Sequence, residues 1–348
     1  MKFVIIGGTR PEWIKLASTI KALDKEYEVV TINTGQHSSM SKDILKDLDI
    51  KPSWTFNTMG LPIQKILTES INGISEIITL EHPDYIIVQG DTISTLAGAL
   101  AGFYTKIPVI HLEAGSRSNN FDEPYPEEMN RVLVDRLSTH RLCMCQEHVD
   151  NLRKEGMDGI VIGNTTIDAI SLIGVTTKEK KNQILITAHR RENWEHMHEI
   201  CTGIKNIALF YPEFTFKFIM HANPKLQEVI KERLEIIRNV QLLQPMSYKD
   251  FLEELSQSYL LVSDSGGASQ EAPSLGVPVV MLRNVCENEL LITNNLAVLV
   301  GTNSEVIFDE IEKLINVNSH YNSMIGINPY GNGKSYEQIL NYIKKVKA

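Results

Sequence analysis

Residues 2–17 read KFVIIGGTRPEWIKLA, and this stretch decides the fold class of the chain. Lys2–Ile6 is a short apolar run typical of a strand, Gly7 and Gly8 end it, and the apolar residues from Trp13 onward recur at helical spacing. Short apolar runs alternate with amphipathic helical stretches in this way along the whole chain. Such alternation predicts an α/β fold with parallel sheets that are covered by helices on both faces.

The alternating pattern occurs twice. In the first half we expect strands at Lys2–Ile6, Val29–Ile32, Tyr85–Val88, Pro108–Leu112, Arg141–Met144 and Gly159–Ile162, with helices at Trp13–Leu23, Ile63–Leu80, Thr92–Tyr104, Glu128–Ser138 and Glu147–Glu155. In the second half we expect strands at Gln183–Thr187, Thr215–Ile219, Val240–Leu242, Tyr259–Val262, Pro278–Met281 and Ala297–Val300, with helices at Met197–Phe210, Pro224–Ile236, Lys249–Ser256, Ala268–Ser274 and Ser304–Ile315. We therefore predict two doubly wound, Rossmann-like domains that face a central cleft.

The domain boundaries are expected near the polar stretch Thr176–Asn182, which has the composition of a linker. We predict an N-terminal α/β domain over residues 1–168 and a C-terminal α/β domain over residues 169–334. The tail over residues 335–348 has a helical pattern at Tyr336–Val346 and could pack back on the first domain.

Composition excludes several classes of protein. The 348 residues are 43% apolar and 22% charged, as in ordinary globular domains. A formal net charge of −9 disfavours a nonspecific nucleic-acid binder. The first residues lack the features of a signal peptide, and no apolar run approaches the roughly 18 residues needed to cross a bilayer. We expect no nucleic-acid partner, no membrane partner and a cytoplasmic location.

The four cysteines fit a reducing compartment. Cys143 and Cys145 are two residues apart, too close for an ordinary disulfide, and they lack the second pair that a zinc site needs. We predict that these two, Cys201 and Cys286 are buried free thiols.

Polar residues follow the strands of the first half, where ligands bind in open α/β sheets. After the first strand, the turn at Gly7 and Gly8 could present backbone N–H groups to an anion, together with Arg10 and Lys15. A plain strand-to-helix turn with a surface arginine is the alternative.

Three acidic residues converge on the same sheet edge. Asp91 follows the strand Tyr85–Val88, Glu113 follows Pro108–Leu112, and Glu127 opens the next helix. Asp91 could instead be a helix N-cap, and Glu128 could simply favour the helix dipole. The convergence of three connections nevertheless predicts a catalytic site.

The second half offers groups that suit an anion. His189, in the basic cluster AHRREN, follows one strand, and His221 follows the next. Ser265, Gly266 and Gly267 form a turn between a strand and a helix, a common seat for a diphosphate. Glu271 lies one turn further along and could accept hydrogen bonds from ribose hydroxyls.

A carboxylate cluster in one domain and a diphosphate seat in the other suit the cleavage of a bond between a sugar and a diphosphate. Departing negative charge would be stabilised by the Ser-Gly-Gly turn, Arg10 and His189. Removal of a weakly acidic C–H beside the anomeric carbon needs a base, and return of the proton to the opposite face needs an acid. Elimination of a nucleoside diphosphate followed by re-addition fits this inventory. Redox chemistry is disfavoured because no dinucleotide fingerprint with its acidic partner is evident.

Nine motifs resemble the non-hydrolysing UDP-N-acetylglucosamine 2-epimerase family, and the resemblance spans nearly the whole chain. They are GGTRPEWIKLA, NTGQH, QGDTISTLAGALA, HLEAGSR, PYPEEMNRVLVDRLS, GNTTIDAI, AHRREN, MHANP and DSGGASQEAPSLGVPVV. The resemblance implies a two-domain glycosyltransferase-B-like fold and a homodimer. It further implies interconversion of UDP-GlcNAc and UDP-ManNAc through a 2-acetamidoglucal, without metal or redox cofactor.

Carried onto matching positions, the resemblance implies specific roles. Asp91, Glu113 and Glu127 would be the acid/base carboxylates. Substrate contacts would come from Arg10, Lys15 and His189, with Ser265, Gly266 and Gly267 on the diphosphate, Glu271 on the ribose and Phe251 beside the uracil. We place His189 with the catalytic residues, and from its position after a strand we expect His221 to contact the substrate as well. Gln36 and His37 match part of the region where many bacterial members bind UDP-GlcNAc as an activator.

The sequence also departs from the family pattern. Ser269 and Gln270 change the polar residues after the glycine turn, and Asn288 replaces an arginine expected near the nucleotide-sugar. Met246 stands where some members have glutamine, and the arginine of the activator region has no clear counterpart around Thr55–Leu61. These departures bear on the sugar and on activation more than on the reaction.

Three other functions remain open at this point. A hydrolysing 2-epimerase would use the same cleft and release free ManNAc and UDP. A glycosyltransferase-B-type transferase would need an acceptor. A nucleotide-sugar sensor would bind without turnover, but it would gain nothing from three carboxylates around an anionic ligand.

Overall fold

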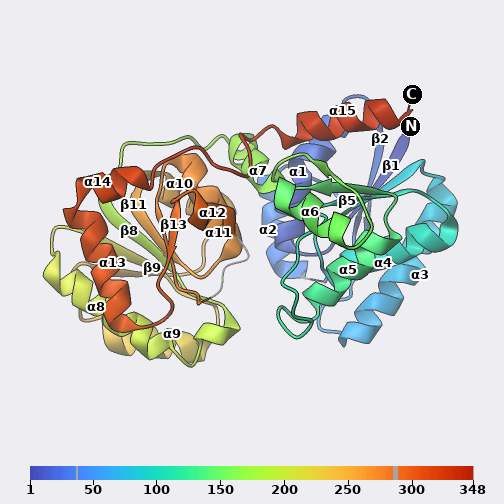
Figure 1. Ribbon diagram of the computed structural model, residues 1–348. Coiled ribbons are helices and arrows are strands. Elements are labelled where there is room, and N and C mark those ends of the chain that lie inside the picture. The colour runs from blue at the N-terminus through green and yellow to red at the C-terminus, as the bar shows by residue number, and fades with distance from the viewer. Residues whose placement is uncertain (37, 285–288, 348) are drawn as a thin grey trace. The chain divides into compact units, whose positions relative to one another are not determined.

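The computed structural model describes residues 1–36, 38–284 and 289–347 (Figure 1). The chain forms two compact units, one of Met1–Ile173 with Tyr330–Ala348 and the other of Gly174–Pro329. The sequence pattern predicts that the second domain covers residues 169–334. In the structure the second unit covers residues 174–329. The second unit begins later than predicted because the helix at Thr165–Ile173, which the sequence pattern did not predict, packs in the first unit.

The sheet of the first unit has seven parallel strands in the order β3-β2-β1-β4-β5-β6-β7. The strands are β1 (Lys2–Gly7), β2 (Glu28–Asn33), β3 (Trp54–Thr55), β4 (Tyr85–Gln89), β5 (Val109–Leu112), β6 (His140–Cys143) and β7 (Ile160–Val161). The strand order reverses between β1 and β4, so the topological switch point of this sheet lies there.

The helices of the first unit pack in two groups. The first contains α1 (Arg10–Leu23), α2 (Ser38–Asp47), α7 (Thr165–Ile173) and α15 (Ser335–Lys347), and the second contains α3 (Ile63–Glu81), α4 (Ile93–Thr105) and α5 (Glu127–Leu137). A further helix, α6 (Gln146–Lys154), packs against β6 and β7. The sequence pattern did not predict α2, α7 or the two-residue strand β3, whose side chains are exposed.

The apolar run in β1 is buried on both faces, as a parallel sheet between helices requires. Val4 and Ile6 share one cluster with Ile77 of α3 and Leu96 of α4. Phe3 and Ile5, which alternate with them along the strand, are also fully buried and point to the opposite face.

The second unit repeats the plan with six parallel strands in the order β10-β9-β8-β11-β12-β13. The strands are β8 (Lys181–Thr187), β9 (Thr215–Ile219), β10 (Val240–Leu243), β11 (Ser258–Ser263), β12 (Val279–Met281) and β13 (Ala297–Leu299). The helices are η1 (Arg191–Asn193), α8 (Met197–Phe210), α9 (Pro224–Leu234), α10 (Tyr248–Gln257), α11 (Gly266–Glu271), η2 (Ala272–Leu275), α12 (Glu289–Thr293), α13 (Ser304–Asn316) and α14 (Asn318–Ser323). Its switch point lies between β8 and β11, and the doubly wound fold predicted for both halves is confirmed.

The carboxyl-terminal helix α15 belongs to the first unit, where it packs against α1 and α7. Several polar contacts hold it there, among them an ion pair between Lys344 and Glu26. Asp168 of α7 accepts hydrogen bonds from the backbone N–H groups of Ser335 and Tyr336, and the Tyr342 hydroxyl lies 2.7 Å from Nδ1 of His140. The expected linker is shorter than the polar stretch suggests, because Lys181 and Asn182 already lie in β8.

Cys143, Cys145 and Cys201 are buried free thiols, as predicted, and Cys286 lies outside the described residues. Burial raises the pKa of the Cys143 and Cys201 thiols to about 12. Within the described part of the chain, no helix combines the length and the apolar character needed to cross a membrane.

Candidate active site

The predicted site residues lie in the loops and first helical turns that follow the strands. In the first unit they follow β1, β2, β4 and β5, and in the second they follow β8, β9, β10 and β11. Four of these strands flank the two switch points, where ligands bind in open α/β sheets.

Glu113 lies at the centre of the polar cluster in the first unit. Its Oε2 accepts hydrogen bonds from Nζ of Lys15 and Nε2 of Gln89. Burial alone would raise the pKa of Glu113, but the charges of Lys15 and Arg131 outweigh it and lower the pKa. Its backbone has a φ of +70°, an uncommon conformation for a residue other than glycine. Such conformations cluster at functional sites, where the surrounding structure must maintain them.

Asp91 forms an ion pair with Arg131 of α5, whose Nε donates a hydrogen bond of 3.0 Å to Oδ2. The side chain of Asn130 donates to the Asp91 carbonyl at 2.8 Å. Asp91 is not the N-cap of α4, because Thr92 takes that position and accepts from the N–H of Thr95. Burial raises the pKa of Asp91, an effect that the Arg131 charge opposes and the Glu113 charge reinforces.

The two acidic residues at the start of α5 differ in their surroundings. Glu127 is the first residue of the helix and is half-buried. Glu128 is buried, and its carboxylate accepts from the backbone N–H groups of Ser118 and Asn119 at 3.0 Å. Glu128 therefore fixes the segment after β5, which leaves Glu127 as the acidic residue of this pair with access to solvent.

The turn after β1 does not present its backbone N–H groups to an anion in the way that we expected from the sequence. Oε2 of Glu12 accepts from the N–H groups of Gly8 and Thr9 at 3.1 and 2.8 Å, so a buried carboxylate already occupies these donors. Gly8 is needed for packing, because a Cβ there would lie about 2 Å from the hydroxyls of Thr34 and Ser94. From this loop the half-buried Arg10 remains as a group that could contact a phosphate, whereas Lys15 is paired with Glu113.

The activator region predicted at Gln36 and His37 is described in part. The side chain of Gln36 accepts a hydrogen bond of 3.0 Å from the Ser94 hydroxyl, next to the turn after β1. His37 lies outside the described residues.

In the second unit, Asp264 joins the loops after β8 and β11. Its fully buried carboxylate accepts from the N–H groups of His189 and Arg190, each at 2.9 Å, and from Nδ2 of Asn193 at 3.0 Å. The backbone of His189 is thereby fixed at the end of β8, while its ring stays 43% exposed. His189 is thus held by its backbone with its imidazole accessible, as a substrate-contacting side chain needs.

The Ser-Gly-Gly turn after β11 has room beside it. Ser265 is the N-cap of α11 and accepts from the N–H of Ala268, and its own N–H donates to the Ser263 hydroxyl at 2.9 Å. A Cβ added to Gly267 would meet no atom within 4 Å. The open space beside exposed Gly267 and the dipole of the helix start suit an anionic group.

The remaining predicted residues of this unit lie on neighbouring elements. The buried carboxylate of Glu271 accepts a hydrogen bond of 2.7 Å from the Tyr248 hydroxyl, and Phe251 lies half-buried on the same helix as Tyr248. Nδ1 of His221 accepts from the N–H of Asn223 at 3.0 Å, and its ring centroid lies 5.9 Å from that of Trp194. Burial and the nearby His189 lower the pKa of His221.

Two of the departures from the family pattern are visible in α11. The Ser269 hydroxyl donates to the Ser265 carbonyl at 2.8 Å, and Asn328 donates to the Gln270 carbonyl at 2.6 Å. Both residues are buried, so they support the turn from within the unit. Asn288 lies outside the described residues.

Sequence reasoning missed four buried polar residues that hold the predicted carboxylates or their loops: Glu12, Arg131, His111 and Asp135. Glu128, Arg131 and Asp135 have the spacing of one helix face, a signal that could have found the last two. Across the described ranges 1–36, 38–284 and 289–347, no group of three or more His, Cys, Asp and Glu could hold a metal ion.

Two doubly wound units with polar loops at their switch points place the chain among two-domain, Rossmann-like proteins of the glycosyltransferase-B-like class. The crystal structure of MurG from Acinetobacter baumannii shares this fold with a TM-score of 0.65 at 13% identity, and the match covers 99% of each chain.

Within this class, the chain belongs to the UDP-N-acetylglucosamine 2-epimerase family, whose profile matches residues 21–344. It is similar to the UDP-N-acetylglucosamine 2-epimerase of Neisseria meningitidis, with 36% identity over 370 residues that cover 99% of this chain and all of the relative. The crystal structure of UDP-GlcNAc 2-epimerase from Neisseria meningitidis bound to UDP-GlcNAc has a TM-score of 0.91, covering 99% of this chain and 100% of that one.

Proposed function

We propose that this chain interconverts UDP-GlcNAc and UDP-ManNAc, or a close 2-acetamido relative, by inversion at C2. Family membership over nearly the full length supports the reaction class. The observation that carries the proposal is the pair of neighbouring carboxylates with different partners: Glu113 accepts from Lys15 and Gln89, and Asp91 is paired with Arg131. These surroundings lower the pKa of Glu113 and, through burial, raise the pKa of Asp91. Environments that separate two such pKa values are typical of acid/base partners.

Inversion at C2 proceeds by elimination and re-addition. A carboxylate removes the C2 hydrogen as a proton, the C1–C2 double bond forms, and the anomeric C–O bond breaks so that UDP leaves with the bonding electrons. The resulting 2-acetamidoglucal then receives a proton on the opposite face of C2, and a diphosphate oxygen of UDP bonds to C1 again. Atoms and electrons balance without an external oxidant or reductant.

The first unit supplies the proton-transfer groups. Glu113, held as an anion by Lys15, is suited to accept a proton, and Asp91, whose pKa is raised by burial, is suited to deliver one. Glu127 is the third acidic residue of this group and is half-buried at the start of α5. Arg10 contacts the sugar-linked phosphate in this proposal.

The second unit supplies the nucleotide-binding groups. The diphosphate lies against Ser265, Gly266 and Gly267, where the space beside Gly267 is open. His189 and His221 contact the departing phosphate, because a nearby donor stabilises the charge that develops on it. Glu271 contacts the ribose, and Phe251 lies beside the uracil.

A product assay tests the proposed reaction. The protein is incubated with UDP-GlcNAc, and UDP-ManNAc, free UDP and free ManNAc are separated and quantified. We expect UDP-ManNAc to appear and approach equilibrium with UDP-GlcNAc while free UDP stays a minor product. Stoichiometric free UDP with free ManNAc would instead indicate the hydrolysing reaction, and the absence of any turnover would contradict the proposal.

We further propose that the protein is a cytoplasmic homodimer. Exposed apolar side chains on α3 and α4, two helices that pack against each other, support self-association: Leu80, Phe103 and Tyr104 are 67%, 56% and 74% exposed. Light scattering of the purified chain would give twice the chain mass of 39.3 kDa if this is right. A single-chain mass at micromolar concentration would contradict it.

A further inference from the structure

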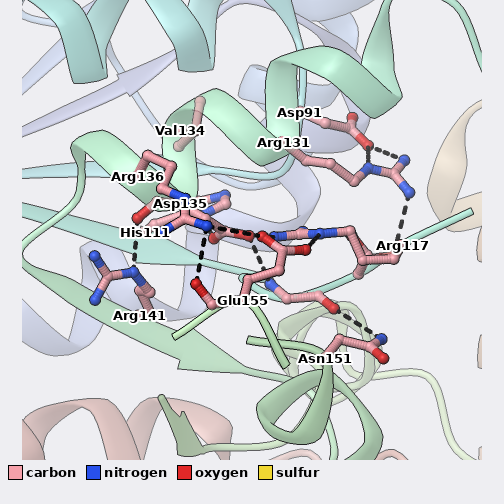
Figure 2. Close-up of polar contacts among 12 residues, drawn as sticks. Asp91, His111, Arg117, Arg131, Val134, Asp135, Arg136, Arg141, Asn151 and Glu155 are labelled. Atoms are coloured by element: carbon pink, nitrogen blue, oxygen red, sulfur yellow. Dashed lines mark hydrogen bonds and ion pairs between the residues drawn. The ribbon is translucent and has the colours of Figure 1, made fainter. Parts of the chain in front are cut away.

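Four polar side chains, those of Glu155, Arg117, Asp135 and His111, form a connected row of hydrogen bonds and ion pairs (Figure 2). Three of them are buried, and Glu155 is 28% exposed. Glu155, at the end of α6, accepts two hydrogen bonds from Arg117 at 2.6 and 3.1 Å. Arg117 lies 2.7 Å from Oδ2 of Asp135, and Oδ1 of Asp135 lies 2.7 Å from Nδ1 of His111. The side chains of His111 and Asp135 are fully buried, and Arg117 is 3% exposed.

Burial of the charged groups in this row costs free energy of desolvation. His111 interrupts the otherwise apolar strand β5, which is buried on both faces. Desolvation of buried ion pairs often cancels their mutual attraction, and well-packed apolar side chains of similar volume stabilise a fold equally well. The hydrogen bonds that His111, Asp135 and Arg117 make to the backbone of neighbouring loops indicate a different role.

At one end of this row, His111 holds the loop that carries Asp91. Nε2 of His111 lies 2.7 Å from the carbonyl oxygen of Gly90, the residue before Asp91. A carbonyl oxygen only accepts hydrogen bonds, so Nε2 carries the proton and donates. Gly90 has a φ of +73°, in the left-handed region, and the bond from His111 therefore fixes an unusual backbone conformation next to a proposed catalytic side chain.

The other end holds the loop that carries Glu113. Oδ2 of Asp135 accepts from the N–H of Gly115 at 3.2 Å, and Arg117 donates to the Ser116 carbonyl at 2.8 Å. Gly115 has a φ of +83° and packs against the backbone of His148. Both loops therefore contain left-handed residues and both are tied to the same His111–Asp135 pair.

The two loops approach each other closely where this pair holds them. A Cβ built on Gly90 would lie 3.7 Å from Oε2 of Glu113. A shift of either loop by one ångström would change the separation of the Asp91 and Glu113 carboxylates. Misplacement on that scale can cost about 100-fold in rate.

We propose that His111 and Asp135 are positioning residues, which hold the loops of Asp91 and Glu113 in the relative position that proton transfer needs. This inference rests on the proposed function of those two carboxylates. His111 and Asp135 act through the Gly90 carbonyl and the Gly115 N–H, not through contact with substrate. Their loss should lower kcat without weakening the binding of UDP, which the second unit supplies.

Two substitutions at His111 separate positioning from simple packing. In His111→Gln the amide nitrogen can occupy the place of Nε2 and donate to the Gly90 carbonyl, whereas in His111→Asn the shorter amide reaches only the place of Nδ1. Asp135→Asn removes the charge with little change of shape. His140→Asn is the matched control, because His140 lies on the neighbouring strand β6 and contacts Tyr342 of α15.

The experiment measures kcat for UDP-GlcNAc, the Kd for UDP and amide hydrogen exchange of peptides that cover residues 88–92 and 112–118. We expect kcat to fall about 100-fold in His111→Asn and Asp135→Asn, with partial recovery in His111→Gln. The Kd for UDP should stay within about twofold of wild type, and exchange in both loops should accelerate in the two impaired variants. His140→Asn should match wild type in all three measurements.

The outcomes separate this inference from the function on which it rests. A wild-type protein that does not epimerise contradicts the proposed function, and hydrogen exchange then still tests whether the His111–Asp135 pair holds the loops. An active wild type with unaltered kcat and loop exchange in His111→Asn and Asp135→Asn would overturn the positioning role. Equal loss of kcat and UDP binding in both variants, without recovery in His111→Gln, would also overturn it, because that pattern indicates a purely structural pair.

Discussion

Asp91 and Glu113 show how neighbouring residues of one chemical type acquire different properties. Glu113 accepts hydrogen bonds from Lys15 and Gln89, and its pKa is lowered. Asp91 is paired with Arg131, yet burial and the nearby Glu113 charge raise its pKa. One carboxylate is thereby kept charged and the other kept closer to protonation, as a reaction that both removes and returns a proton requires.

Removal of the charge from any of the three acidic residues of the first unit should impair catalysis. Asp91→Asn, Glu113→Gln and Glu127→Gln should each lower kcat by roughly 100-fold or more, because a general acid or base contributes that much. Steady-state kinetics with UDP-GlcNAc measures the effect. A near-normal rate for any of the three would remove that residue from the mechanism.

His148, a buried residue of α6, gives a prediction about pH. Burial lowers the pKa of His148 from 6.5 to about 4, although the Glu113 charge opposes this. Above pH 6.5 the imidazole is neutral in the folded and unfolded chains and costs nothing. Below that pH the unfolded chain binds a proton that the folded chain excludes, so the free energy of unfolding falls until about pH 4.

The expected loss between pH 7 and pH 5 is about 2 kcal/mol, from the usual 1.36 kcal/mol for each unit of pKa. Urea unfolding of wild type and His148→Gln at both pH values measures it, and the variant should lose less stability by that amount. Equal pH dependence of the two proteins would show that His148 titrates normally in the folded state.

At the level of single residues, sequence reasoning found the acidic side chains but not the groups that tune them. Asp91 and Glu113 could be predicted because they follow buried strands directly. Arg131 and Asp135 could not be linked to them, because that link depends on how α5 packs beside β4 and β5. Glu12 was missed for a similar reason: its carboxylate folds back onto the turn that precedes it.

At the level of elements, the turn after β11 is the proposed binding site for the diphosphate. Ser265 caps α11, and the space beside Gly267 is open. A diphosphate placed there would interact with the positive end of the helix.

Substitution at Gly267 tests this element directly. Gly267→Asp places a negative charge in the open space and should weaken UDP binding by at least tenfold, because like charges repel. Gly267→Asn has nearly the same shape without the charge and should weaken binding less. Isothermal titration with UDP measures both variants, and thermal melting checks that each is folded. Equal affinities of Gly267→Asp and wild type would place the diphosphate elsewhere.

Most strands and helices could be predicted because periodicity of apolar residues is a local property of the sequence. The pattern gave α8 with the same bounds as the structure and β9 likewise. It failed at β3, which has two exposed residues, and at α7, where the sequence pattern predicted no element. Short elements and exposed strands carry too few apolar residues to show a period.

At the level of the whole molecule, the duplication of the α/β plan assigns different chemistry to each unit. The first unit gathers acidic side chains at the carboxyl ends of β4 and β5. The second gathers histidines and a glycine turn at the ends of β8, β9 and β11. Under the proposed function both sets have a use, because a UDP-sugar has a ring that must exchange a proton and a diphosphate that must leave and return.

The most direct test of this account is proton NMR of UDP-GlcNAc incubated with the protein in deuterium oxide. We predict that deuterium replaces hydrogen at C2 of both recovered UDP-sugars as the epimers equilibrate, because the C2 hydrogen leaves as a proton and solvent replaces it. Epimerised product that retains its original C2 hydrogen would contradict proton abstraction by the carboxylate cluster.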